Sequence, residues 1–311
     1  MVDNNVVIKF KGEDVSLAQS ANNATEALKS IGIVAGATSV AIGGLFAAGT
    51  REFARFDDAL ANFSSKSGIA KDQLDSLADE SIRLASATSQ TPATVAELST
   101  ALLALGASTE DAEQNLESIS FLADAIQDDL ILTGKVVQTG ANIFGEFGES
   151  ADTLSDKIST LINTTAAGSS GGVAEFLDLF SNAGPIAVEA GVAFDDLSAA
   201  FATLRDNGFQ ASVAGTAIRT ALVRLAAPGD DAKAALEGLG VSFEEFTDAA
   251  GNFQFSDFLK ALNEGLSQIG SNNERIAALS KIFGDEAAPA IASLASQAVA
   301  ADGELSRLDN T

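Results

Sequence analysis

The segment Gly191-Val-Ala-Phe-Asp-Asp-Leu197 contains a glycine, then a short apolar step, then two carboxylates and a leucine. A similar order recurs at three other places: Gly68-Ile-Ala-Lys-Asp-Gln-Leu74, Gly106-Ala-Ser-Thr-Glu-Asp-Ala112 and Gly240-Val-Ser-Phe-Glu-Glu-Phe246. Glycine readily adopts the left-handed conformation that ends a helix, and acidic residues in a first turn offset the helix dipole. These joints predict helices connected as αα-hairpins.

The composition supports the same fold class. Trp and Tyr are absent and alanine and leucine are abundant, so helix formers outnumber strand-favouring aromatics. We therefore expect an all-α fold of short to medium amphipathic helices. Because the joints are unevenly spaced along the chain, we do not expect a repeat protein. Two proline segments, Asn182-Ala-Gly-Pro185 and Ala227-Pro-Gly-Asp230, are expected to end helices.

The N-terminal part differs from the rest. Residues 6–10 predict a short strand or extended arm, and residues 14–29 a polar helix. The charge-free run at residues 31–49 predicts an N-terminal apolar Ala/Gly-rich helix of about 30 Å, close to the thickness of a hydrocarbon core. This helix is a possible membrane-spanning segment, in which small residues would allow close helix packing. The alternative is a helix packed against other chains, because its five glycines weaken a helix. The expected helix-packing or membrane positions are Gly32, Gly36, Gly43 and Gly44.

Composition shifts suggest four regions. Residues 1–50 form the arm and apolar helix, residues 51–167 a first helical unit, residues 173–300 a second, and residues 301–311 a tail or truncation point. Gly168-Ser-Ser-Gly-Gly172 is expected to be a flexible connector between the two helical units. Most phenylalanines fall in the second unit, where helical spacing predicts that they form its core.

Charge and residue content argue against most chemistry. The chain has 18 basic and 43 acidic residues, a net charge of −25, and neither Cys nor His. Phosphate contacts need a basic surface, so specific nucleic-acid binding is not expected. No phosphate loop, dinucleotide fingerprint or nucleophile elbow is present. Adjacent carboxylates such as Asp128-Asp129 and Asp195-Asp196 are interpreted as helix starts. We expect no catalytic residue, no cofactor and no metal site.

The second helical unit contains four distinctive segments. They are Gly215-Thr-Ala-Ile-Arg-Thr-Ala-Leu-Val-Arg-Leu-Ala-Ala-Pro228, Ala235-Leu-Glu-Gly-Leu-Gly-Val241, Asp248-Ala-Ala-Gly-Asn-Phe253 and Ile282-Phe-Gly-Asp-Glu-Ala287. The first predicts a helix with Ile218, Leu222 and Leu225 on one face and two arginines off it. Residues 248–252 predict a turn, Ser256 a cap for a helix over residues 257–269, and Ser242 to Glu245 a capping box.

Three further segments precede these four: Phe53-Ala-Arg-Phe-Asp-Asp-Ala-Leu60, the stretch from Thr94 to Ala112, and Phe121-Leu-Ala-Asp-Ala125. In order and spacing, the whole set resembles the core of the phage tail tape measure family typified by lactococcal phages. The resemblance covers about residues 51 to 297. The motif positions it singles out are Gly215, Arg219, Leu222, Leu225, Pro228, Gly240, Gly251, Phe283 and Gly284.

The resemblance implies a structural protein of the virion that lies in the lumen of the tail tube. Such a protein sets tail length during assembly in the host cytoplasm, and it is ejected at infection. Expected partners are other copies in a parallel trimer or hexamer, the tail tube protein, a tail assembly chaperone, and distal tail or baseplate proteins. The host membrane is a further expected contact, and a channel-forming module acting through residues 31–49 is the alternative. Family members continue into longer helical regions, so we expect this sequence, phage or prophage in origin, to be part of a longer protein.

Overall fold

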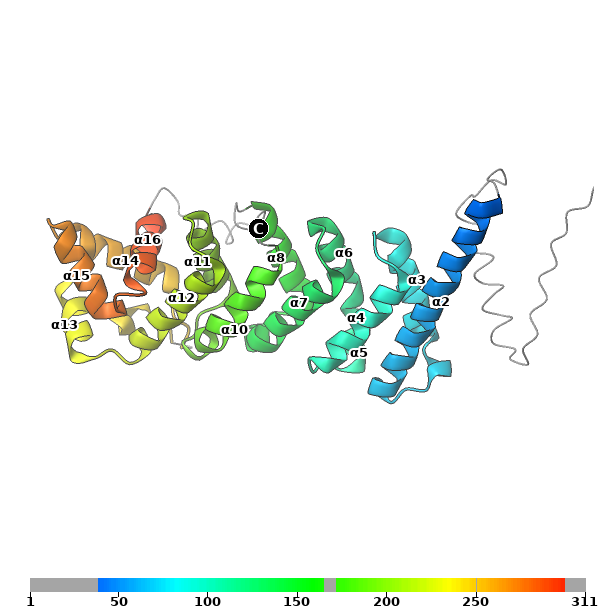
Figure 1. The fold of residues 1–311 in the computed structure, drawn as a ribbon. Coiled ribbons are helices and arrows are strands. Elements are labelled where there is room, and N and C mark those ends of the chain that lie inside the picture. The colour runs from blue at the N-terminus through cyan, green and yellow to red at the C-terminus, as the bar shows by residue number, and fades with distance from the viewer. Residues whose placement is uncertain (1–38, 165–171, 250, 300–311) are drawn as a thin grey trace, which may run out of the picture. The chain divides into compact units, whose positions relative to one another are not determined.

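Helices make up almost all of the regular structure in the computed structural model, which describes residues 39–164, 172–249 and 251–299. In these ranges the only pairing of extended backbone is an isolated antiparallel bridge between Thr247 and Phe253. The prediction of an all-α fold is confirmed. By its internal contacts the chain divides into two compact units, residues 1–52 and 53–311, and the second contains nearly all of the described helices (Figure 1).

The helices before the connector are α2 (Ser39–Ser67), α3 (Asp75–Ala87), α4 (Pro92–Ala104), α5 (Thr109–Gln114), α6 (Leu116–Ile126), α7 (Leu130–Phe144) and α8 (Ala151–Thr164). Those after it are α10 (Ala174–Glu189), α11 (Phe194–Asp206), α12 (Ala211–Ala226), α13 (Asp230–Gly238), α14 (Phe255–Ser267), α15 (Asn272–Phe283) and α16 (Ala288–Val299). Short 3-10 helices occur at η1 (Lys71–Gln73), η2 (Gly145–Phe147) and η3 (Phe243–Phe246).

Left-handed glycines end helices at all four predicted joints. Gly68, Gly106, Gly191 and Gly240 have φ angles of 76°, 95°, 74° and 70°. The N–H groups that follow bond back to the preceding helix, for example Val192 to the carbonyl of Ala187 at 2.8 Å. This is the hydrogen-bonding pattern by which a helix satisfies its last carbonyls. The expectation of glycine-terminated helices is confirmed.

The two proline segments behave differently. Ala227-Pro-Gly-Asp230 separates α12 from α13, as predicted. Asn182-Ala-Gly-Pro185 does not end a helix, because α10 continues through Pro185 to Glu189. The Pro185 ring is exposed, and the residue before it is glycine, whose missing side chain removes part of the clash that bars the residue before proline from helix. The predicted stop at Pro185 is wrong.

Helix α2 runs across the expected boundary at residue 50, which stays a prediction. Its described part is one helix of 29 residues from Ser39 to Ser67, so the end of the Ala/Gly run and the segment from Phe53 to Leu60 share a helix. A single glycine at position 49 is too weak a breaker to interrupt the helix formers on either side. The predicted strand at residues 6–10, the predicted helix at residues 14–29 and the first part of the apolar run, with Gly32 and Gly36, lie outside the described residues.

No helix within the described ranges is both long enough and apolar enough to cross a membrane. Residues 39–49 continue into a helix that carries Arg51, Glu52 and Arg55. The described helix therefore does not support the membrane-spanning interpretation.

Polar caps start several helices. The side chains of Thr91, Ser108 and Asp129 accept hydrogen bonds from the N–H groups of Thr94, Asp111 and Leu132. Two predicted caps differ. Helix α14 begins at Phe255, which places Ser256 inside its first turn, and the segment from Ser242 to Glu245 leads into the 3-10 helix η3 instead of an α-helix. Phenylalanine burial at positions 255 and 258 sets this start in place of the serine cap.

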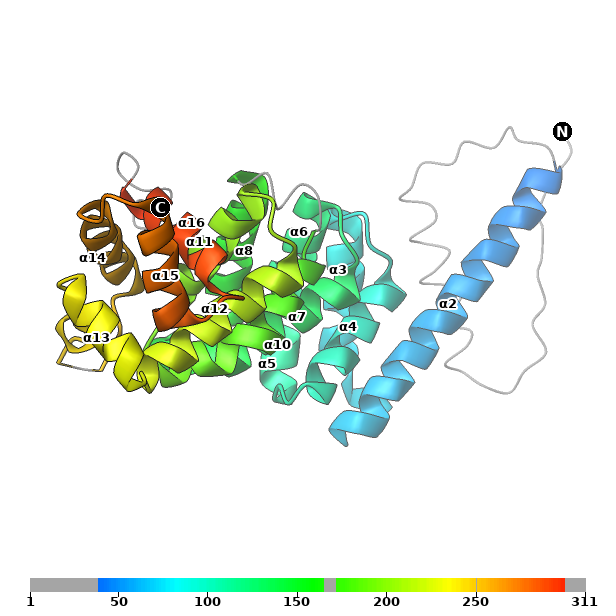
Figure 2. The same ribbon diagram turned by 60° about the vertical axis from the view of Figure 1, so that its left-hand side comes forward.

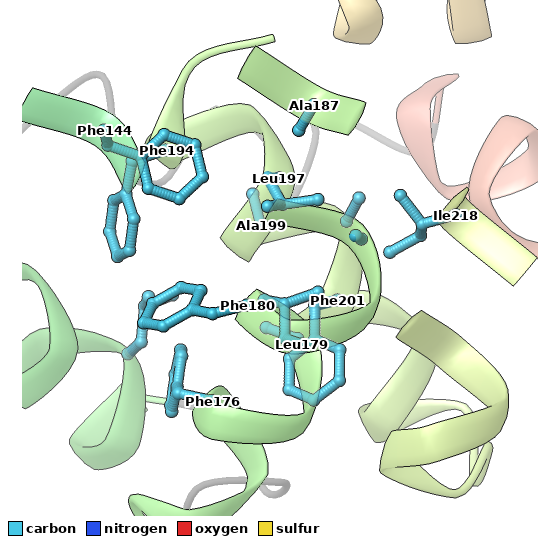
Figure 3. Packing of buried hydrophobic residues seen from close by; sticks show 14 of the residues in the cluster. Phe144, Phe176, Leu179, Phe180, Ala187, Phe194, Leu197, Ala199, Phe201 and Ile218 are labelled. Carbon is cyan, nitrogen blue, oxygen red and sulfur yellow. The ribbon is translucent and has the colours of Figure 1, made fainter. Parts of the chain in front are cut away.

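The core runs through the second compact unit as one hydrophobic cluster. Helix α10 packs against both α7 and α12 (Figure 2). Around it Phe144, Phe176, Phe180, Phe194 and Phe201 meet at ring-centroid distances of 5.7 to 6.2 Å, mostly tilted or edge-to-face (Figure 3). Such geometry adds about 0.5–1.5 kcal/mol per pair to the burial itself. The predicted phenylalanine core is confirmed, while the division at residues 168–172 into two helical units and the tail at 301–311 stay predictions.

Candidate functional site

The four distinctive segments of the C-terminal part are linked by packing of α15 against α12 and α13, and by a hydrogen bond from the turn before α14 to the joint at Gly191. In helix α12, Ile218, Leu222 and Leu225 are buried, and Arg219 and Arg224 are exposed, as the apolar spacing predicts. Gly215 lies where α12 meets α10, and a Cβ atom there would come within 3.4 Å of the Cβ of Asn182. A small residue at 215 thus allows the two helices to pack closely.

The side chain of Asp248 fixes the turn at residues 248–253. Asp248 accepts hydrogen bonds from the N–H and the amide group of Asn252 at 2.8 and 2.9 Å. Gly251 has a φ of 93°. The turn then places the N–H of Phe253 2.9 Å from the carbonyl oxygen of Gly191, so it is bonded to the joint between α10 and α11.

Aromatic rings anchor the same turn from the other side. The Phe253 ring stacks on Phe243 with centroids 4.3 Å apart, and it also lies 5.4 Å from Phe258. Phe246 meets Phe258 edge-to-face at 5.8 Å. The η3 segment, the turn and α14 are thereby held together by rings that are fully or half buried.

The last segment contacts α12 through an arginine. Phe283 is fully buried, and Gly284 ends α15 with a φ of 78°. A Cβ atom on Gly284 would lie 2.8 Å from a terminal nitrogen of Arg224 and 3.0 Å from its Cζ atom. The Arg224 guanidinium therefore occupies the space next to this glycine, at the carbonyl end of α15, where a positive charge is favourable.

The remaining motif positions serve the connections. Pro228 lies between α12 and α13, and Gly240 ends the turn after α13 with a positive φ. Gly43 and Gly44 lie on α2. Gly265 was missed by the sequence reasoning, although its Cβ would meet the carbonyl oxygen of Leu239 at 2.4 Å. The available signal was a glycine within the last turn of an amphipathic helix, which costs about 1 kcal/mol unless packing requires it.

Two ion-pair groups were also missed. Arg205 of α11 forms a forked contact with Glu175 of α10 and donates to the carbonyl of Phe209. Lys157 of α8 donates to Glu149 at 2.6 Å and to Asp195 at 2.9 Å, and its ammonium lies 5.7 Å from the centre of the Phe194 ring. No sequence pattern pairs residues so far apart in the chain.

These contacts shift the pKa values of few ionisable groups. Burial alone would lower the pKa of Lys157, but the hydrogen bonds that its ammonium donates to Glu149 and Asp195 outweigh this effect, and the pKa is raised. The bond from Arg83 lowers the pKa of Glu80, and bonds from Ser89 lower the pKa of Asp124. All three pKa values shift toward the charged form, which favours the ion pairs of Lys157 and Glu80 and the hydrogen bonds to Asp124 and does not prepare a group for proton transfer at neutral pH.

The described residues contain no group of three or more His, Cys, Asp or Glu side chains placed to hold a metal ion. Several paired carboxylates occupy helix starts: Asp129 caps α7, and Asp195 and Asp196 lie in the first turn of α11. The linked contacts of the four segments form a packing junction that positions helices. Whether its individual residues matter for function stays a prediction.

Known proteins resemble this chain over the same region. Residues 78–284, more than half of the chain, match the model of the family described as phage-related minor tail protein. The probable tape measure protein of Escherichia phage P2 is 33% identical over 157 residues, which are 50% of this chain and 18% of that protein. The chain thus covers less than a fifth of that relative's length, and the lactococcal type of the resemblance stays a prediction. No solved structure matches the chain significantly.

The family match covers α4 to α15 completely. It includes the joints at Gly106, Gly191 and Gly240 together with three of the four motif segments, and it ends at Gly284 within the fourth. The features that build the packing junction are therefore the ones that the family model describes. This chain belongs to the family of phage-related minor tail proteins.

Proposed function

We propose that this chain is a phage tail tape measure protein, or the N-terminal part of one. In this role it lies in the lumen of the tail tube, sets tail length during assembly and leaves through the tube at infection. The observation that carries the proposal is the family match over residues 78–284, joined with the identity to a probable tape measure protein.

The charge of the chain suits a position on the path of DNA. A net charge of −25 repels phosphate backbones, so a protein in the tube does not bind the DNA that later passes there. It also keeps the chain soluble in the host cytoplasm before assembly. A basic protein in the same place would obstruct DNA transfer.

The compact unit is better suited to organising the tail than to measuring it. The longest described helix, α2, has 29 residues, which is about 44 Å of helix, and only its part from Phe53 onward belongs to this unit; the other helices are much shorter. We infer that residues 53–299 act as a folded assembly region. The measuring function would then belong to long continuous helices in the complete protein.

Assembly requires partners that fit a folded acidic region. The proposed partners are other copies of the chain in a parallel trimer or hexamer, the tail tube protein, a tail assembly chaperone, and distal tail or baseplate proteins. Closed symmetric oligomers are the usual arrangement of identical chains.

The proposal is tested by inactivating the gene in the phage or prophage that encodes the chain and imaging the particles by electron microscopy. We expect heads without tails, or tails of irregular length, and normal tails when the intact gene is supplied in trans. A supplied gene with Phe283→Asp, which unfolds the junction by burying a charge, should fail to restore tails. Normal tails in the absence of the gene would refute the proposal.

A further inference from the structure

Helix α12 has a second face, opposite the one that packs into the core. On this face Val213, Thr216, Thr220 and Val223 follow one another at intervals of three and four residues, and we call these four residues the α12 seam. Val213 and Val223 are 46% and 44% exposed, Thr216 is exposed and Thr220 is half-buried. Single exposed apolar residues are common on protein surfaces, but alternating spacing of three and four is the pattern of a helix-pairing surface.

The seam is bordered by two positive charges. If its residues occupy the a and d positions of two heptads, Arg219 falls at the g position and Arg224 at the e position. Residues at e and g choose the partner in paired helices, because their charges meet across the interface. Helix α12 contains no Asp or Glu, although the chain as a whole is strongly acidic.

Neither arginine is neutralised within the described part of the molecule. Most other arginines of the compact unit have carboxylate partners, as Arg55, Arg83 and Arg205 do. Arg219 and Arg224 form no ion pair with another described residue. The Arg224 guanidinium lies beside Gly284 at the carbonyl end of α15, where the helix dipole favours a positive charge but no carboxylate of a described residue pairs with it.

We propose that the α12 seam docks an acidic amphipathic helix supplied by another protein of the tail, with apolar residues at heptad spacing and carboxylates at its flanking positions. Charge complementarity identifies this occupant. Two copies of α12 paired with each other would bring their arginines together, which disfavours a symmetric contact through this face. The inference rests on the proposed tail function only for the source of the partner.

A peptide of about three heptads with leucine at a and d and glutamate at e and g is a direct probe. Mutual repulsion of its glutamates keeps this peptide from pairing with itself near neutral pH. A second peptide of the same length with lysine at e and g is the matched control. Binding of each labelled peptide to the full chain is measured by fluorescence anisotropy at low and high salt.

The acidic peptide is expected to bind and the basic one is not, with weaker binding at high salt because exposed ion pairs are screened. The variant R219E/R224E should bind the acidic peptide about tenfold more weakly and gain binding of the basic one. The double variant Val213→Ser with Val223→Ser should bind the acidic peptide more weakly than the wild type does. The variant K66E/K135E makes the same change in net charge at exposed sites away from α12 and should behave like the wild type.

No binding of the acidic peptide, or equal binding of both peptides, would overturn the proposal. A dimer of the wild-type chain that dissociates in R219E/R224E would also overturn it, because a second copy would then be the occupant. Circular dichroism shows whether each variant retains its helices. The assay contains no tail component, so its failure leaves the effect of gene inactivation on tails unchanged, and the two proposals are tested separately.

Discussion

The N–H group of Phe253 donates a hydrogen bond of 2.9 Å to the carbonyl oxygen of Gly191. This bond joins the helix-ending glycine between α10 and α11 to the turn that precedes α14. Both residues lie in segments that the sequence singles out, one as a joint and one as a family motif. Their contact connects one helix joint to one motif segment within the packing junction.

Gly191→Ala should be strongly destabilising. A Cβ atom at this position would lie 2.2 Å from the carbonyl oxygen of Gly251, and the φ of 74° disfavours any side chain. The conformational penalty alone is about 1–2 kcal/mol, and the backbone clash adds to it. Gly208→Ala is the control, because Gly208 has a φ of 86° with nothing within 4 Å. Urea unfolding should show a clearly larger loss for Gly191→Ala, and equal losses would mean that the turn does not press on this joint.

Pro185→Ala should stabilise the protein. Pro185 lies inside α10, where it removes the hydrogen bond to the carbonyl of Ser181, and its ring is exposed, so little packing is lost. The regained helix bond outweighs the greater freedom of the unfolded chain, for a net gain of about 1 kcal/mol. Pro228→Ala, between two helices, should instead lose about 0.4–1 kcal/mol. Thermal unfolding compares the two, and a loss of stability in Pro185→Ala would contradict this account of α10.

The Glu175–Arg205 pair should contribute more to stability than the Asp257–Lys260 pair. The side chains of the first are 17% and 14% exposed, and those of the second 56% and 48%. Removing one partner from the first pair leaves a poorly hydrated charge and should cost about 1–3 kcal/mol, against less than about 0.5 kcal/mol for the second. Double-mutant cycles with Glu175→Gln and Arg205→Met, and with Asp257→Asn and Lys260→Met, measure both couplings. Equal couplings would contradict the ranking by exposure.

Stability should be nearly constant from about pH 6 to 9, because the chain has no His, Cys or Tyr. Above this range Lys157 matters. Its folded pKa is raised above the ordinary value of 10.5, so its stabilising contribution is complete below that value and is lost as pH rises through the folded pKa. Lys157→Met should be less stable at pH 7 and should lose less stability between about pH 10 and 12.

Lys135→Met is the control for this prediction, since Lys135 is exposed and forms no ion pair with another described residue. Its unfolding free energy should follow the wild-type pH profile. If Lys157→Met showed the same alkaline loss as the wild type, the bridge from Lys157 to Glu149 and Asp195 would not exist in solution.

Local signals in the sequence were sufficient to predict the all-α fold and the helix ends at four glycines. The roles of the glycines at 68, 106, 191 and 240 were predictable, because few residue types other than glycine adopt the left-handed conformation that ends a helix. Pro185 was misjudged because a local rule for proline ignores the tertiary contacts of α10, which maintain the helix through that position. The start of α14 was misjudged for a similar reason, since burial of Phe255 prevailed over a serine cap.

The candidate site was only partly predictable. The buried and exposed faces of α12 follow from periodicity. The contacts of Arg224 with Gly284 and of Arg205 with Glu175 join segments far apart in the chain, and one sequence holds no signal of such proximity. The continuity of α2 across residue 50 was not predictable from composition, because a change in composition is not a break in a helix.

The position of the chain in the particle tests the central claim most directly. Tails purified from the phage or prophage that encodes the chain are treated with protease, before and after DNA release is triggered, and peptides from residues 53–299 are quantified by mass spectrometry. The account predicts that these peptides are present and protected in intact tails and depleted after release. Their absence from intact tails, or their digestion while the tube is still closed, would contradict it.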